Sequence, residues 1–383
     1  MKLSPVRSPV CLRRQAATGP SAAFAADFQN LALTLYDSGT AALTTAIRDA
    51  VLRHRSAQPQ VILPAYGCPQ LVSACLYAGA QPRIVDVAAN QWGYDLTALQ
   101  RALNPDTAAI VAANLLGIGD QAAQLLPLAR DNGSLLIQDS AQHLPAQPGN
   151  WCGDYVVLSF GRGKPLNLLR GGALAIPAQT PLREDAPLLT GARARLRQAA
   201  LGSRAAGLAF NVITHPRVFG PASHLPGLGL GATTYDALTQ ATRLPPSTWS
   251  QLNPAYAAYA RREAVFPWDA VLPGWQERGL TELTCADHTA PTRHRRLRLA
   301  LLAPNRVTRD TLLAALDREG LGGSAMYGVA IDAIANIPPP IRAQGPFPNA
   351  AHLADRLLTL PTHAAVTPQV VAQTDACLRR ALG

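Results

Sequence analysis

Residues 159–172 read SFGRGKPLNLLRGG, a glycine-rich turn that carries Lys164 near its middle. The chain has 34 lysines and arginines, but only two of them, Lys2 and Lys164, are lysines. Arginine stays protonated in proteins, whereas a partly buried lysine can lose its proton and form a Schiff base. The turn therefore predicts a nucleophilic lysine at position 164 rather than one more surface charge.

A phosphate-binding loop is the main rival interpretation of this turn. That motif needs G-x-x-x-x-G-K followed by Ser or Thr. Leu158 stands at the position of the first glycine, and Pro165 follows the lysine. The pattern of a nucleotide triphosphatase therefore fails at two positions.

Helical and strand-like patterns alternate along the chain on the N-terminal side of the turn. Apolar positions recur at helical spacing in residues 40–52, 69–78, 95–103 and 121–131. Short apolar runs typical of buried strands lie at 60–63, 83–87, 108–113, 134–138, 154–160 and 171–176. This alternation predicts an α/β fold whose mostly parallel sheet is covered by helices on both faces.

Two short segments of this α/β region carry candidate binding residues. Ser38, Gly39 and Thr40 stand at the start of the predicted helix 40–52. A helix N-terminus offers free N–H groups to an anion, and a glycine permits close approach; a plain Ser or Thr N-cap is the alternative. Asp139 directly follows the strand-like run LLIQ, at the edge where open α/β sheets bind ligands. A helix cap or a surface ion pair is its alternative role.

Length and composition limit the remaining classes. The length of 383 residues suits a large domain, placed at 31–250, and a linking helix with a small domain, placed at 251–383. Residues 1–30 are rich in Pro, Ala and Ser and are expected to form a loose N-terminal arm. Six scattered cysteines without a C-x-x-C pair indicate neither a zinc site nor a disulfide framework. No apolar run reaches 18 residues, which predicts no membrane span, and a cytoplasmic enzyme is expected.

The formal net charge of +10 favours acidic partners. Dispersed arginines, 5% aromatic residues and the absence of a recognition motif argue against nucleic acid, and a phosphorylated small molecule fits equally well. Within an irregular insertion at 178–243, one stretch combines basic and apolar residues: Arg193, Arg195, Leu196, Arg197, Leu201, Arg204 and Leu208. It could contact a membrane surface or an anionic partner, form a solvated helix face, or make a dimer contact.

The C-terminal part shows a second α/β pattern. A long helix is expected from about 244 to 265, strands at 297–302 and 357–360, and a last helix from Pro368 to about 382. A further helix is expected at 309–319, with Thr308 as its cap and Gly320 as its end. The glycines in GLGLG at 227–231 follow no strand and do not indicate a nucleotide loop.

Taken together, these motifs resemble the DegT/DnrJ/EryC1/StrS family of pyridoxal-phosphate-dependent sugar aminotransferases. The resemblance covers residues 30–180 well and the C-terminal unit more loosely. The matching motifs, in order, are SGTAAL (38–43), VILPAYGCP (61–69), AGAQPRIVDV (78–87), QDSAQ (138–142), SFGRGK (159–164), RGGALAIP (170–177) and LPTH (360–363). The resemblance implies the fold type I of pyridoxal-phosphate enzymes, with a large and a small domain.

The resemblance also implies roles for individual residues. Lys164 would form the internal aldimine and later carry a proton between cofactor and substrate carbons. Asp139 would hold the pyridine nitrogen in its protonated form, so that the ring acts as an electron sink. Gln142 would contact the ring hydroxyl oxygen. The backbone of Gly39 and Thr40 and the hydroxyl of Ser159 would hold the phosphate.

Three positions depart from the family's usual pattern. Cys68 aligns where most members have an aromatic residue stacked on the cofactor ring, and Tyr66 lies two residues earlier. Asn114 stands where many members have His. The family's G-x-N-x-R loop, which reaches the neighbouring subunit's phosphate site, does not occur between 178 and 250.

The resemblance implies transfer of an amino group from glutamate or glutamine to a nucleotide-linked keto sugar, in polysaccharide or antibiotic sugar biosynthesis, by a homodimer. Three alternatives stay open. A sugar 3-dehydratase would have His in place of Lys164; a binding or regulatory protein on the same fold would carry no cofactor; and a nucleic-acid-binding protein would show steeply salt-dependent retention of DNA.

Overall fold

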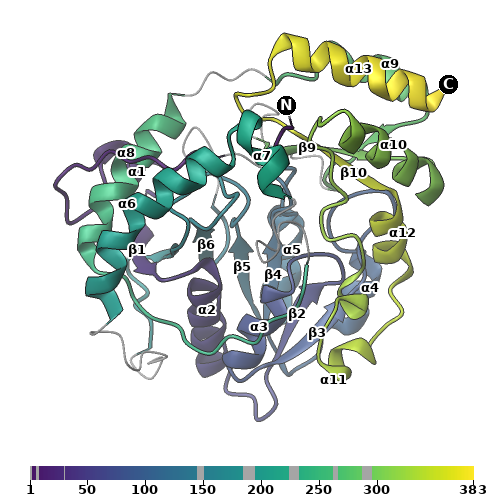
Figure 1. Cartoon of the computed structure of the whole chain (residues 1–383). Helices are drawn as coiled ribbons and strands as arrows, with labels where there is room; N and C mark the ends of the chain where they lie inside the picture. Colours follow the sequence, from purple (N-terminus) through teal and green to yellow (C-terminus); the bar gives the residue numbers. More distant parts are fainter. Residues whose placement is uncertain are drawn as a thin grey trace.

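The computed structural model describes residues 2–5, 8–29, 31–144, 151–183, 195–223, 233–261, 266–286 and 296–383. Within them the chain forms a seven-stranded sheet of order β1-β7-β6-β5-β4-β2-β3 and a three-stranded sheet of order β10-β9-β8 (Figure 1). The strands of the large sheet are β1 (Leu31–Tyr36), β2 (Gln60–Pro64), β3 (Gln81–Val85), β4 (Thr107–Ala113), β5 (Leu135–Asp139), β6 (Tyr155–Ser159) and β7 (Gly172–Pro177).

The direction of the strands confirms the mostly parallel sheet. Strands β3, β2, β4, β5 and β6 are parallel neighbours, and β7 runs antiparallel between β6 and β1. Each expected strand is present, although β3 begins two residues before the predicted run at 83–87. The carboxyl ends of the five parallel strands therefore lie along one edge.

Helices cover both faces of this sheet (Figure 1). The helices of this unit are α1 (Ala22–Ala26), α2 (Gly39–His54), α3 (Gln70–Tyr77), α4 (Leu96–Ala102), α5 (Ala122–Asp131), α6 (Arg195–Ile213), α7 (Pro216–Ser223) and α8 (Trp249–Ala260). Side chains alternate across each strand, so Val61 and Leu63 of β2 join the core under α2 and α3, while Ile62 joins the core under α4 and α5. Helix α8 packs against β6 and β7 with α1.

The small sheet is built from β8 (Thr281–Glu282), β9 (Arg298–Leu302) and β10 (Leu357–Pro361). Its helices are α9 (Leu272–Gln276), α10 (Arg306–Arg318), α11 (Pro339–Arg342), α12 (Pro348–Arg356) and α13 (Pro368–Leu382). Ala300 and Leu302 of β9 join the core of the large unit, whereas Leu299 and Leu301 pack in a separate core with α10 and α13. The small sheet therefore buries both faces.

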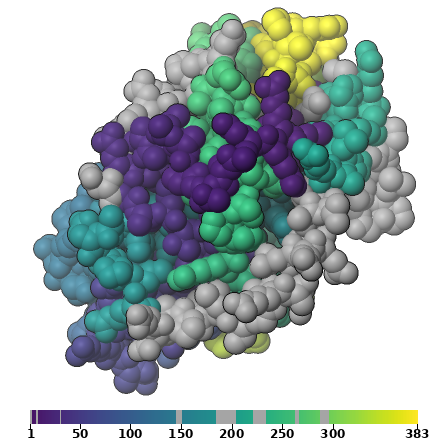
Figure 2. Space-filling view, turned by 90° about the vertical axis from the view of Figure 1, so that its left-hand side faces the viewer, coloured from purple at the N-terminus to yellow at the C-terminus, as the bar shows by residue number. Residues whose placement is uncertain are grey.

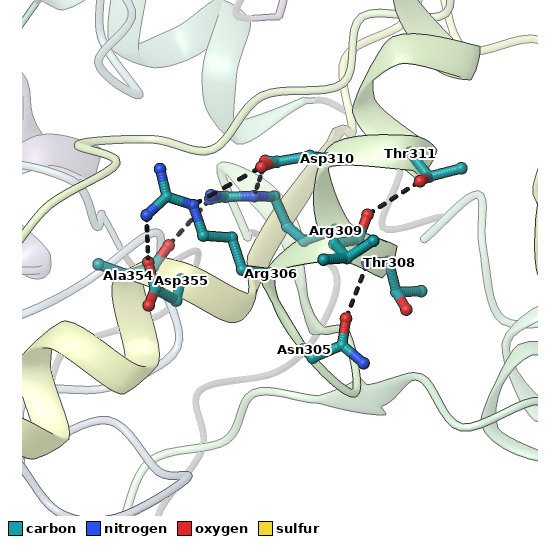
Figure 3. Close-up of polar contacts among 9 residues, drawn as sticks. Asn305, Arg306, Thr308, Arg309, Asp310, Thr311, Ala354 and Asp355 are labelled. Carbon is teal, nitrogen blue, oxygen red and sulfur yellow. Dashed lines mark hydrogen bonds and ion pairs between the residues drawn. The ribbon is translucent and has the colours of Figure 1, made fainter.

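The N-terminal cap of helix α10 differs from the one predicted from the sequence (Figure 3). The helix begins at Arg306, and the Asn305 side chain accepts a hydrogen bond from the Thr308 N–H, so Asn305 rather than Thr308 is the cap. Within α10, the buried Arg309 donates to the Ala354 carbonyl oxygen at 2.9 Å. That hydrogen bond ties α10 to α12.

The small unit is also joined to the β3 edge of the large sheet. Both carboxylate oxygens of Asp86 accept hydrogen bonds from the first turn of α12, at Asn349 and Ala350. The Gln344 side chain bonds the backbone of Ile84 and Pro82. This edge would otherwise offer unpaired backbone groups.

The expectation of a loose N-terminal arm is wrong for its described residues. Leu3 is 1% exposed in the core between α10 and α13, and its N–H donates to the Gly320 carbonyl oxygen. Buried Arg298 donates to the carbonyl oxygen of Pro5. Phe24 and Phe28 pack beneath α8, and Lys2 pairs with Asp317 at 2.8 Å. The Pro- and Ala-rich composition gave no sign of these apolar anchors.

The insertion at 178–243 contains two helices among its described residues, α6 and α7. Part of the basic stretch, from Arg195 onward, lies in α6, whereas Arg193 and the segment 227–231 lie outside the described residues. The long helix expected from 244 is shorter at its start, because a 3₁₀ turn, Pro246–Thr248, precedes α8. Its expected end near 265 also falls outside the described residues.

Candidate active site

A cavity of about 180 Å³ opens at the carboxyl edge of the large sheet. Strand β4 brings Asn114 to it, β5 brings Asp139, and β6 brings Ser159 with Lys164 in the loop that follows. The N-terminus of α2 closes one side. Residues 40–164 thus supply most of the lining, and Tyr327 reaches it from the C-terminal unit.

Lys164 and Asp139 are the two oppositely charged side chains of the cavity. Among the described residues, the Lys164 amine has no ion pair, and Asp139 accepts one hydrogen bond, from the Ala141 N–H at 3.0 Å. Burial raises the pKa of Asp139, while the Ala141 N–H and the charge of Lys164 act to lower it. A cation next to Asp139 would hold it ionised.

The start of α2 places Gly39 against β6 and β7. A Cβ atom at Gly39 would lie 2.7 Å from the Ser159 Cβ, so the space beside this glycine holds the Ser159 side chain. Close packing against Ser159 therefore requires the glycine, which also lines the cavity. Ser38 does not line the cavity, and its hydroxyl caps α2 by accepting the Ala41 N–H. Thr40 and the Ser159 hydroxyl remain on the cavity wall as donors.

Gln142 is fixed in place by two neighbours. Its amide oxygen accepts the Leu116 N–H at 3.1 Å, and its amide nitrogen donates to the Tyr327 hydroxyl at 2.7 Å. Burial raises the pKa of Tyr327 well above its ordinary value, so this hydroxyl keeps its proton. Tyr327 is not predictable as a site residue from the sequence, because no local pattern around it marks a site.

The structure shows which candidates for the ring-stacking residue line the cavity. Tyr66 is fully buried behind the cavity, with its ring 5.4 Å from the ring of Tyr327, and it does not line the wall. Cys68 lines the wall, as do two aromatic residues, Tyr327 and Trp92. The Trp92 indole is held by a hydrogen bond to the Ala113 carbonyl oxygen. Trp92 lies between a predicted strand and a predicted helix, and no motif there marks it as a site residue.

The donor set fits pyridoxal phosphate. The ring needs a carboxylate for its nitrogen, an amine for its aldehyde and donors for its phosphate, and Asp139, Lys164, Thr40 and Ser159 offer these groups on one cavity wall. The Asn114 amide oxygen is buried beside them without a hydrogen-bond partner among the described residues. An orphaned polar atom of this kind is expected where a ligand completes the site.

His143, next to Gln142, gives a pH-dependent prediction. Burial lowers the pKa of His143 from 6.5 to about 4. Because the unfolded chain then binds this proton first, the free energy of unfolding should fall by up to about 3 kcal/mol as the pH drops from 6.5 to 4. His143→Asn should remove that part of the slope. Urea unfolding at several pH values measures it, and an unchanged slope in the variant would contradict the assignment.

Comparison with known proteins points to the same family as the sequence motifs. Residues 21–186 match the model of the DegT/DnrJ/EryC1/StrS aminotransferase family. The matched segment spans less than half of the chain. The family segment contains every residue carried over by the resemblance, from Gly39 to Lys164.

The curated relatives match this chain over only part of their own length. The UDP-N-acetyl-3-dehydro-alpha-D-glucosamine 3-aminotransferase of Acidithiobacillus ferrooxidans is 30% identical over 38% of this chain and 40% of its own. Protein MosB of Rhizobium meliloti is 34% identical over 35% of this chain and 27% of its own. The chain thus spans less than half the length of these relatives.

A solved structure extends the likeness to the whole fold. A Streptococcus pneumoniae protein described as a sugar aminotransferase, solved in its PLP form, matches 96% of this chain and 93% of its own. The TM-score is 0.64 at 17% identity. The expected fold of pyridoxal-phosphate-dependent transferases, including the C-terminal unit, is therefore confirmed. No helix among the described residues is long and apolar enough to cross a membrane.

Proposed function

We propose that this protein is a pyridoxal-phosphate-dependent aminotransferase that acts on a sugar. The observation that carries the proposal is the meeting of Lys164 and Asp139 on one cavity wall with the start of α2. The family of residues 21–186 and the related aminosugar enzyme support it. Pyridoxal phosphate, when bound, supplies the electron sink for moving an amino group.

Each residue has a defined task in this proposal. Asp139 pairs with a ring nitrogen that carries a proton, and its raised pKa falls again once that positive charge is present. The Lys164 amine accepts and returns a proton at the reacting carbon. Thr40 and Ser159 bind the phosphate, and Gln142, fixed by Leu116 and Tyr327, orients the ring hydroxyl.

The finer parts of the assignment are proposals of the same kind. We propose a nucleotide-linked keto sugar as the acceptor and glutamate or glutamine as the donor, which the chemistry named for the Acidithiobacillus ferrooxidans relative supports. A role in polysaccharide or related biosynthesis, a cytoplasmic location, a homodimer and the division at residues 30 and 250 belong to the same proposal. The open cavity and basic surface suit a diphosphate-bearing sugar.

Two alternatives make different demands on the site. A sugar dehydratase of this family would replace the lysine by His, and Lys164 argues against it. A cofactor-free binding protein has no use for an amine and a buried carboxylate in the same cavity.

One spectrum of the purified protein tests the proposal. After incubation with pyridoxal phosphate and removal of the excess, we expect a visible absorbance band that glutamate or glutamine converts to the band of the aminated cofactor. Addition of a keto sugar nucleotide should restore the first band. A protein that binds no cofactor would be a binding protein on this fold, and one whose band ignores amino donors would not be an aminotransferase.

A further inference from the structure

A basic and apolar surface lies on α6, α7 and the N-terminal arm, and none of its residues lines the active-site cavity. We define the arm–α6 face as residues 8–15 together with residues 204–220. The two segments are joined by paired hydrogen bonds between the Val10 backbone and the Asn211 side chain. A Cβ at Gly207 would meet Val10 at 2.9 Å and Leu12 at 3.0 Å, so the arm lies directly on α6. Figure 2 shows the purple arm lying across this side of the molecule.

Large apolar side chains point outward from this face. Leu208 is 55% exposed and Val212, one helical turn later, is 50% exposed. Leu12 and Val218 are each 37% exposed. Of the seven exposed large hydrophobic residues in the described part of the chain, these are four. Such a concentration marks an interaction surface rather than scattered exposure.

The charge around these apolar residues has one sign. Arg13, Arg204 and Arg217 are exposed on the face. The sequence contains no Asp or Glu in residues 1–26 or in residues 186–235, although the chain has 24 acidic residues. Two carboxylates line a cavity beside α7, and both are neutralised: Asp317 pairs with Lys2 and Glu319 with Arg380.

We propose that the arm–α6 face binds the surface of an anionic membrane. Exposed leucine and valine side chains on a helix with arginines and no carboxylates match the interfacial binding of amphipathic helices, which combines apolar insertion with attraction to acidic headgroups. A second copy is a poorer occupant, because a twofold interface would place the same arginines opposite one another without a counter-charge. The proposal is independent of the aminotransferase activity.

Vesicle flotation of the full chain tests the proposal. The wild type should float with vesicles that contain phosphatidylglycerol and stay behind with pure phosphatidylcholine. Each Arg→Gln change is expected to weaken binding about fivefold, so R204Q/R217Q should lose about twenty-five-fold. L208S/V212S should lose at least about tenfold through lost apolar insertion. All four substituted residues are exposed, and circular dichroism can check that each variant keeps the wild-type fold.

Matched controls use exposed residues of α10, on the C-terminal unit. V307S removes a comparable apolar side chain, and R306Q a comparable charge. Neither should change vesicle binding. Absence of wild-type flotation, equal binding to both lipids, or unchanged binding in the face variants would overturn the proposal. A wild-type dimer that L208S/V212S converts to a monomer, or retention of DNA without flotation, would assign the face to a subunit or to nucleic acid instead.

Discussion

Lys164→Arg is expected to be as inactive as Lys164→Ala. Arginine keeps the positive charge that could attract a phosphate, but its guanidinium cannot form an imine or exchange a proton near neutral pH. The loss of proton transfer alone should lower turnover by about 10²–10⁴-fold. Steady-state transamination and the visible band of the lysine-bound cofactor measure the effect.

The second lysine of the chain supplies the control. Lys2→Arg preserves the ion pair with Asp317, 2.8 Å away in the wild type, and should keep full activity. Borohydride reduction of the wild type, followed by peptide mapping, should place the cofactor on Lys164. Label on Lys2, or substantial activity in Lys164→Arg, would contradict the assignment of Lys164 as the Schiff-base amine.

Asp139→Asn should retain bound cofactor but lose about 10- to 1000-fold in turnover, because a close opposite charge is worth about 1–3 pK units. The amide can still accept the hydrogen bond from the Ala141 N–H, so the loop should keep its shape. It cannot hold a protonated ring nitrogen. Absorbance titration with pyridoxal phosphate and turnover assays separate binding from chemistry.

Asp95→Asn is the matched control for the loss of one carboxylate. Asp95 caps α4 through the Thr97 and Ala98 N–H groups, and asparagine caps a helix about equally well. We expect wild-type turnover from this variant. Near-normal transamination by Asp139→Asn would instead remove Asp139 from the catalytic assignment.

Periodicity and local motifs predict six of the seven strands of the large sheet, and β1 is the strand that they miss. The strands before Asp139 and Lys164 are short apolar runs bounded by polar or glycine residues, and such runs are specified locally. The candidate residues on these strands meet because the carboxyl ends of parallel strands share an edge. Asn305 was missed because Thr308 is also a good capping residue, and only the backbone shows which of them precedes the first turn.

Contacts between distant segments were outside the reach of local patterns. Tyr327 reaches Gln142 from 185 positions further along the chain, and nothing in its neighbours predicts that contact. At Gly39 the structure shows a second reason for the glycine that the motif does not reveal. The Ser159 side chain packs against it, so a larger residue would not fit. The same motif predicts Ser38 as a cofactor contact, and in the structure its hydroxyl caps α2 by accepting the Ala41 N–H.

The burial of Leu3 beside β10 has a consequence for synthesis of the protein on the ribosome. Leu3 packs with Leu358 and Leu360, which are translated more than 350 residues later. At about 5–20 residues per second, the first residues wait on the order of 20–70 s for their partners. The large sheet can form meanwhile, whereas the small core closes only when Leu3 meets β10. Until then the arm remains exposed to proteases and chaperones, so its substitutions should affect cellular yield more than catalytic rate.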